Sequence, residues 1–301
     1  MFSLHQSAHF VWLLLPSLLF VAETGAAEQL RWKLKPDDRL KMVSSQVVAT
    51  KTTYTGAEVE STIDLRLEGE WIVTGVNDGA IQLTQKVTRV RMEMQSPKTD
   101  PVAFDTGDEK RATALARQLQ GAIAPLIGAS LQVKMSDRGE ILSVELPAEL
   151  SQPKPADEKS AGEPKPLTTA ADELKSLLAR PLLILPKNEV SAGDTWTVED
   201  ATNAPAGALA LKKTFKLVEL ADTDSGQVAK IEAEAKVELD AKTRLKVTES
   251  GFNQTVDFNL DDGLVTSSKQ ELRLRTEQPY RETTIVVDVT TTLTTTLERM
   301  Q

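Results

Sequence analysis

Residues 62–73 read Thr-Ile-Asp-Leu-Arg-Leu-Glu-Gly-Glu-Trp-Ile-Val, and apolar and polar side chains alternate along most of this stretch. Successive side chains of a β-strand point to opposite faces of a sheet. One face therefore carries Ile63, Leu65, Leu67, Trp71 and Val73, and the other carries Thr62, Asp64, Arg66, Glu68 and Glu70. This pattern predicts an antiparallel strand with one buried side and one charged, solvent-facing side.

The same alternation recurs over residues 229–239 and 285–298. Strands of some fifteen residues at about 3.3 Å per residue are roughly 50 Å long, two to three times the usual length. Strands of this length twist and curl, so we expect the apolar face to be concave. A change of apolar parity within residues 81–94 predicts a β-bulge near Thr88 and Arg89.

Turn signals separate these runs. Each combines an Asp or Asn with a Gly that is free to adopt a positive φ, which favours hairpins. The four turns are Asn77–Gly79, Asp137–Gly139, Asp224–Gly226 and Asp261–Gly263.

Two segments have the three- and four-residue apolar spacing of helices, residues 109–128 and 170–179. A sheet with one apolar face needs a cover, and an amphipathic helix can supply it. Residues 182–185, Leu-Leu-Ile-Leu, predict an extended strand or a sheet edge. The expected fold is mainly β (α+β), with two units of long, curled antiparallel strands and one or two helices packed on their concave apolar faces.

A Pro-rich, charged stretch at residues 151–167 divides the chain into units at 28–150 and 168–301. Each unit opens on a turn with an Asp, at Leu34–Leu40 and Val190–Trp196, and closes on an Asp-x-Gly hairpin, which predicts an internal repeat. Whether the two sheets are separate or continuous stays open.

The first 27 residues predict a signal peptide. Residues 10–22 are an apolar run too short to cross a bilayer, and small residues follow at 24–27. An uncleaved interfacial anchor is the alternative, and no later apolar run is long enough to span a membrane. We therefore expect export to the bacterial periplasm or the cell exterior.

The composition excludes several kinds of chemistry. The chain has no Cys, and its two His, His5 and His9, lie in the predicted signal segment. The exported protein would lack Cys-His zinc sites and the Ser-His or Cys-His pairs of hydrolases. The full chain has a net charge of −9, which is unsuited to nucleic acid. We expect no enzyme activity, no cofactor, no metal and no nucleic-acid partner.

Residues 30–40, with Trp32, Pro36, Asp38 and Leu40, together with Gly193–Trp196, resemble a family of uncharacterised exported bacterial proteins, a domain of unknown function with the pattern W-x-x-x-P-G-D-x-L. Asp37 stands where that pattern has Gly. The resemblance implies no catalytic residues. In architecture alone, a curved sheet around a helix is similar to lipoprotein-localisation carrier domains.

The remaining acid-base candidates are carboxylates, and their positions in the sequence favour turns over catalysis. Asp37-Asp38 and Asp261-Asp262 are adjacent in sequence, whereas glycosidase acids face each other from separate elements. Residues 222–226 imitate the start of a calcium loop, but Lys230 and Ala233 stand where further ligands are required, which favours a hairpin.

The candidate apolar groove or core consists of Trp71, Leu67, Leu115, Leu119, Ile123, Trp196, Phe258 and Leu293. The leading hypothesis is a non-enzymatic protein that binds a lipid, an acyl chain or a protein segment in a concave sheet groove. One alternative is a structural or envelope-interaction protein with a packed core and a partner at a sheet edge. The other is a hydrolase that uses carboxylates alone.

Overall fold

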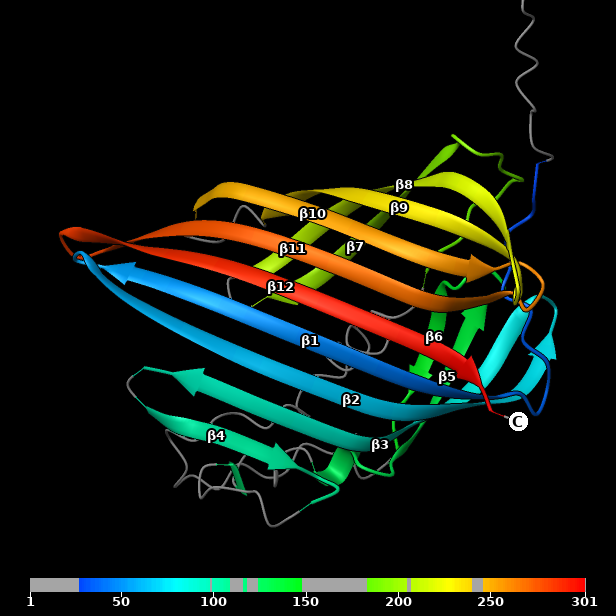
Figure 1. Ribbon diagram of the computed structural model, residues 1–301, viewed down its shortest axis with the longest axis horizontal. Helices are drawn as coiled ribbons and strands as arrows, with labels where there is room; N and C mark the ends of the chain where they lie inside the picture. Colours follow the sequence, from blue (N-terminus) through cyan, green and yellow to red (C-terminus); the bar gives the residue numbers. More distant parts are fainter. Residues whose placement is uncertain are drawn as a thin grey trace, which may run out of the picture.

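The computed structural model describes residues 27–97, 99–108, 116–117, 124–147, 183–204, 207–239 and 246–300. In these residues a 12-stranded antiparallel sheet dominates (Figure 1). The mainly β class is confirmed. The strands of the first half are β1 (Arg39–Tyr54), β2 (Ala57–Asn77), β3 (Ala80–Ser96), β4 (Thr99–Asp105), β5 (Ser130–Ser136) and β6 (Ile141–Glu145). Those of the second half are β7 (Thr195–Ala204), β8 (Gly207–Thr223), β9 (Gly226–Leu239), β10 (Lys246–Asn259), β11 (Leu264–Tyr280) and β12 (Thr283–Arg299).

The two halves share one continuous sheet, which answers the question that the sequence left open. Its order is β6-β5-β3-β2-β1-β12-β11-β10-β9-β8-β7, and β4 pairs with the second half of β3. β1 and β12 join the halves in a register that runs from Leu40 opposite Arg299 to Thr53 opposite Val286. The first and last long strands of the chain are therefore neighbours at the centre of the sheet.

The turns and the bulge lie where the sequence places them. Residues 77–79, 137–139, 224–226 and 261–263 connect β2 to β3, β5 to β6, β8 to β9 and β10 to β11. The β2–β3 register shifts between Glu68, opposite Arg89, and Gly69, opposite Val87. Thr88 is thus the extra residue, and its insertion reverses the side-chain parity of β3.

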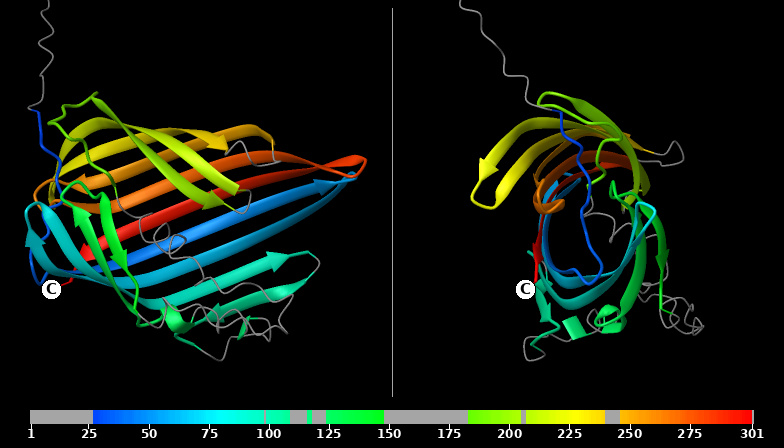
Figure 2. Two further views of the ribbon diagram at one scale, coloured as in Figure 1. Left: turned by 180° about the vertical axis from the view of Figure 1, so that it is seen from behind. Right: turned by 90° about the vertical axis from the view of Figure 1, so that its right-hand side faces the viewer.

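Two segments outside the sheet lie within its curve, as the end-on view in Figure 2 shows for the first of them. We call residues 28–38 and 183–190 the end plug. Backbone hydrogen bonds join the Trp32 nitrogen to the Asp137 oxygen at 2.8 Å and the Lys33 nitrogen to the Gly263 oxygen at 3.0 Å. The Leu185 nitrogen donates to the Arg138 oxygen at 2.8 Å. The plug therefore ties together the turns of both halves at one end of the sheet.

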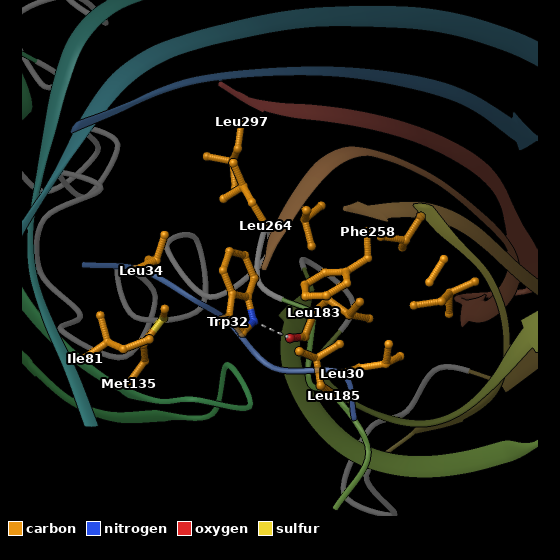
Figure 3. Packing of buried hydrophobic residues seen from close by; sticks show 14 of the residues in the cluster. Leu30, Trp32, Leu34, Ile81, Met135, Leu183, Leu185, Phe258, Leu264 and Leu297 are labelled. Atoms are coloured by element: carbon orange, nitrogen blue, oxygen red, sulfur yellow. Dashed lines mark hydrogen bonds between the residues drawn. The ribbon is translucent and has the colours of Figure 1, made fainter. Parts of the chain in front are cut away.

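The plug corrects one expectation. Of the apolar residues 182–185, those described, 183–185, are outside the sheet, and Leu183 and Leu185 are 2% and 0% exposed. Their backbone is held by the turn at residue 138 and by side-chain donors rather than by a neighbouring strand. Trp32 Nε1 donates to the Leu183 oxygen at 3.2 Å (Figure 3), and Trp196 Nε1 donates to the Ile184 oxygen at 2.9 Å.

The main hydrophobic core surrounds the plug (Figure 3). Leu30, Trp32 and Leu34 of the plug pack there with concave-face residues such as Phe258 and Leu297. A second, smaller cluster contains Val87, Val90, Val102, Phe104 and Ala116. The plug thus covers the apolar face of the sheet at this end, whereas the sequence analysis predicted that helices would cover it.

The predicted helices stay untested, because residues 170–179 and most of 109–128 lie outside the described residues. Within residues 109–128, Ala116 is buried in the smaller cluster, and a short 3-10 turn spans Ala124–Leu126. The linker at 151–167 and the signal segment, except for its last residue, also lie outside them. Among the described residues, no helix has the length and apolarity needed to cross a membrane.

The two turns that open the predicted repeat have the same hydrogen bonds. Asp38 and Asp194 each accept a hydrogen bond at 2.8 Å, from the backbone nitrogens of Lys35 and Ser191. The residue before each Asp has a positive φ, 72° at Asp37 and 96° at Gly193. Asp37 therefore adopts the left-handed conformation that glycine adopts in the second half.

The concave face of the sheet as a candidate functional site

The face of the sheet toward the plug, here called the concave face, continues beyond the plug to the far ends of the long strands. The register fixes its members, because residues directly opposite each other share a face. One row across the centre joins Ile63 to Val48, Val48 to Thr291, Thr291 to Leu272, and Leu272 to Phe252. Ile63, Val48, Thr291 and Leu272 are half-buried, and Phe252 is buried. Much of this row thus keeps partial solvent contact.

Charge is segregated between the two faces. Between the plug and the far end, the concave face of seven strands has no charged residue at any described position. These strands are β1, β2, β3, β9, β10, β11 and β12, and their concave-face residues are apolar, Thr, Ser, Gln, Gly or Tyr. On β12 these positions are Thr283, Ile285, Val287, Val289, Thr291, Leu293, Thr295 and Leu297. An apolar chain can lie along such a surface without desolvating a buried charge.

The opposite, convex face carries ion pairs. Lys230 Nζ lies 2.6 Å from Glu219 Oε1, and this hydrogen bond raises the pKa of Lys230. Arg275 Nη1 lies 3.2 Å from Asp288 Oδ1 across the β11–β12 pair. The positively and negatively charged side chains that alternate with apolar ones along these strands therefore form the solvated outer surface of the sheet.

At the far end, the β1–β2 and β11–β12 hairpins project side by side (Figure 1). Tyr54 and Tyr280 meet there edge to face, with ring centroids 5.9 Å apart, and they are 39% and 42% exposed. Both occupy concave-face positions. The concave face therefore ends on two solvent-accessible aromatic rings.

The structure places the sequence-predicted site residues in different surroundings. Trp71 and Phe258 are 1% exposed and belong to the core around the plug. Trp196 is half-buried and stacks on Phe215 at 5.4 Å. Leu67 packs against both clusters, and Leu293 lies on the concave face at 8% exposure. Leu115, Leu119 and Ile123 lie outside the described residues.

Lys213 was missed by the sequence reasoning. In β8 it stands between Leu211 and Phe215 at a concave-face position, opposite Ala235 of β9. Its Nζ lies 5.6 Å from the centroid of the Phe252 ring on β10. The small side chain of Ala235 allows the lysine to reach across β9. The signal was available, because Lys213 breaks the apolar alternation Leu209, Leu211, Phe215 and Leu217.

The carboxylate pairs serve turns. Asp38 caps its turn and lies 3.3 Å from Arg299, while Asp261 accepts a hydrogen bond from the Gln227 nitrogen at 3.2 Å. Residues 223–226 form the β8–β9 hairpin, as the sequence favours. The described residues contain no group of three or more His, Cys, Asp or Glu arranged to hold a metal ion.

Asp105 is the carboxylate with the strongest electrostatic perturbation among the described residues. Its Oδ1 and Oδ2 accept hydrogen bonds from Arg89 at 2.8 and 2.7 Å, and Oδ1 accepts a third from the Gly107 nitrogen at 2.9 Å. These donors, Arg89 foremost, hold its pKa far below the ordinary value although burial opposes them. The cluster fixes the end of β4 against β3, so we assign it a structural role.

A family model described as "Family of unknown function (DUF6263)" matches residues 78–265, more than half of the chain. The chain therefore belongs to this family, and the expectation of an uncharacterised domain family is confirmed. The matched range contains the Gly193–Trp196 turn but not the Trp32–Leu40 motif. The similarity to lipoprotein-localisation carriers stays untested.

No curated protein sequence matches the chain significantly. Among solved structures, it is similar to the COG4313 outer membrane channel from Pseudomonas putida F1, with 7% identity, 88% of this chain and 97% of that chain covered, and a TM-score of 0.25. It is also similar to the translocator domain of autotransporter NalP from Neisseria meningitidis, with 10% identity, coverage of 88% and 90%, and a TM-score of 0.16. At these TM-scores neither similarity supports an argument about function.

Proposed function

We propose that this member of the DUF6263 family is an exported, non-enzymatic binding protein that holds an apolar chain, such as the acyl chain of a lipid, on its concave face. The observation that carries the proposal is the segregation of charge. Seven strands present an uncharged surface beyond the plug, in which half-buried and buried residues are mixed, while their convex face carries ion pairs.

The length of this surface suits a chain-like ligand. From Leu272 to Tyr280, β11 advances eight residues, which is about 26 Å at 3.3 Å per residue. One leaflet of a bilayer has a hydrocarbon depth of about 15 Å. The concave face is therefore long enough for one extended acyl chain. The plug would limit how far the chain enters, because core residues fill the opposite end.

The proposal is tested with the full chain, purified and delipidated. Titration with the apolar dye 1-N-phenylnaphthylamine should give saturable fluorescence that a long-chain fatty alcohol displaces. Native mass spectrometry before delipidation should show bound species in the mass range of lipids.

An absence of dye binding and of bound lipid would contradict the proposal. A defined oligomer or a captured envelope protein, together with no dye binding, would favour the alternative of a packed protein that acts through a sheet edge.

A further inference from the structure

We propose that the ligand of the concave face is an anionic single-chain amphiphile, typified by a fatty acid, whose carboxylate binds at Lys213 and Gln254. This inference rests on the proposed function and specifies its ligand class. Three observations carry it: the position of Lys213, an unsatisfied polar atom on Gln254, and the continuity of the surface between these residues and the far end.

Lys213 stands where the core gives way to the half-exposed part of the concave face. Phe252, under its ammonium group, belongs to the core around the plug, whereas Leu272, opposite Phe252 on β11, is half-buried. Lys213 also makes a further interaction within the chain. A ligand carboxylate would therefore share the ammonium group, whose three N–H groups allow more than one acceptor.

Gln254 is the next concave-face residue after Phe252 on β10, about 6.6 Å along the strand. It is 9% exposed, and its Oε1 has no hydrogen-bond partner among the described residues, while Nε2 donates to Ser268 Oγ at 3.1 Å. A buried polar atom without a partner is costly, so its presence needs a reason.

A bound carboxylate supplies that reason. The Ser268 hydroxyl can donate as well as accept, so the Gln254 amide can turn, accept from Ser268 through Oε1 and present Nε2 to the ligand. Lys213 and Gln254 together then offer a cation and a neutral donor to one carboxylate. A charge-assisted hydrogen bond of this kind is stronger than a neutral one.

The chain of the ligand would run from this point along β11 and β12. Leu272, Leu274, Val289 and Val287 occupy the concave-face positions on the way to Tyr280. All of them are uncharged and apolar, so the tail would contact apolar side chains while the carboxylate contacts Lys213 and Gln254.

The test compares oleate with oleyl alcohol, which has the same tail and no charge. Binding is measured by displacement of 1-N-phenylnaphthylamine at pH 8.5, where a free carboxylate is ionised. The wild-type chain should bind oleate about tenfold more tightly than the alcohol, the value of one charge-assisted hydrogen bond. Acetate should not displace the dye, because it has no tail.

Lys213→Met should remove the preference, so that this variant binds oleate and oleyl alcohol with equal affinity, whereas Lys213→Arg should retain the preference. Lys212→Met is the matched control, because Lys212 is the adjacent residue on the convex face, 3.4 Å from Glu199. Gln254→Leu should weaken oleate binding severalfold, since it removes the neutral donor to the carboxylate.

Equal binding of oleate and alcohol by the wild-type chain would overturn the inference while leaving the proposed function intact. This comparison remains decisive if Lys213→Met does not fold. Binding of neither compound would overturn both proposals.

Discussion

At the scale of single residues, Gly139 decides whether the plug can dock. Its φ is 89°, and a Cβ at this position would collide with the Leu183 carbonyl oxygen and approach Trp32 Nε1 to 2.7 Å. Both of these groups belong to the plug. The absence of a side chain at residue 139 therefore allows the turn between β5 and β6 to contact residues 32 and 183 directly.

We expect Gly139→Ala to lower the free energy of unfolding by about 2–5 kcal/mol, the combined cost of a left-handed non-glycine residue and of overpacking. Gly56→Ala is the matched control, because Gly56 has a φ of 80° and no atom within 4 Å of the added Cβ. Gly56→Ala should lower the free energy of unfolding only by the cost of a left-handed non-glycine residue, about 1–2 kcal/mol. Urea unfolding measures both, and equal losses would show that the plug does not contact Gly139.

Asp105 makes stability depend on acid pH. Its folded-state pKa is lowered by Arg89, so its contribution is present above the unfolded-state pKa of about 3.9 and is lost as the pH falls below it. Asp105→Asn should therefore be less stable than the wild type at pH 7, by about 1–2 kcal/mol, because Arg89 is partly exposed. This difference should shrink between pH 4 and pH 2. A constant difference across that range, in urea titrations, would contradict the assignment.

At the scale of elements, the strands and turns were predictable, and the plug was not. Alternation with period two identifies β2, β9 and β12, and Gly-containing turns mark the end of β2 and the start of β9, because both signals are local. Residues 183–185 are as apolar as a buried strand. Hydrogen bonds to other parts of the chain, such as those from Trp32, Trp196 and Arg138, hold this segment within the curve of the sheet and outside its strands.

The central pairing of β1 with β12 joins residues about 250 positions apart, as in the Thr295–Ser44 contact. Because the chain has no Cys, an engineered pair reports on this register without competing thiols. Ser44→Cys with Thr295→Cys should oxidise to a disulfide, since the two residues are directly opposite on the concave face.

The control is Ser44→Cys with Thr294→Cys. Thr294 pairs with Ser45 and points to the other face, so no disulfide should form. Non-reducing electrophoresis and intact mass distinguish the products. Efficient cross-linking of the control pair alone would show that the two halves pair in a different register.

At the scale of the whole molecule, the sequence predicted a concave apolar face but not where it is covered. Trp71 and Phe258, chosen as groove or core residues, lie in the core, because the plug fills that end of the sheet. Lys213 visibly interrupts the apolar alternation of its strand, but the sequence alone does not show which side chain its ammonium group contacts. Its position over Phe252 depends on the order β8-β9-β10, which requires the fold.

The segregation of charge is a property of the entire sheet, and two neighbouring threonines of β12 allow it to be tested. Thr291 lies on the concave face opposite Val48 and Leu272, while Thr290 lies on the convex face opposite Ala49 and Arg273. Both are half-buried. Glutamate at either position changes the net charge equally, so any difference in binding reports the face alone.

The most direct measurement is therefore the affinity of Thr291→Glu and Thr290→Glu for 1-N-phenylnaphthylamine, with circular dichroism to verify that both variants fold. We expect Thr291→Glu to bind the dye at least about tenfold more weakly than the wild type, because the ligand would bury an unpaired carboxylate. Thr290→Glu should bind as the wild type does. Wild-type affinity in a folded Thr291→Glu variant would contradict binding on the concave face.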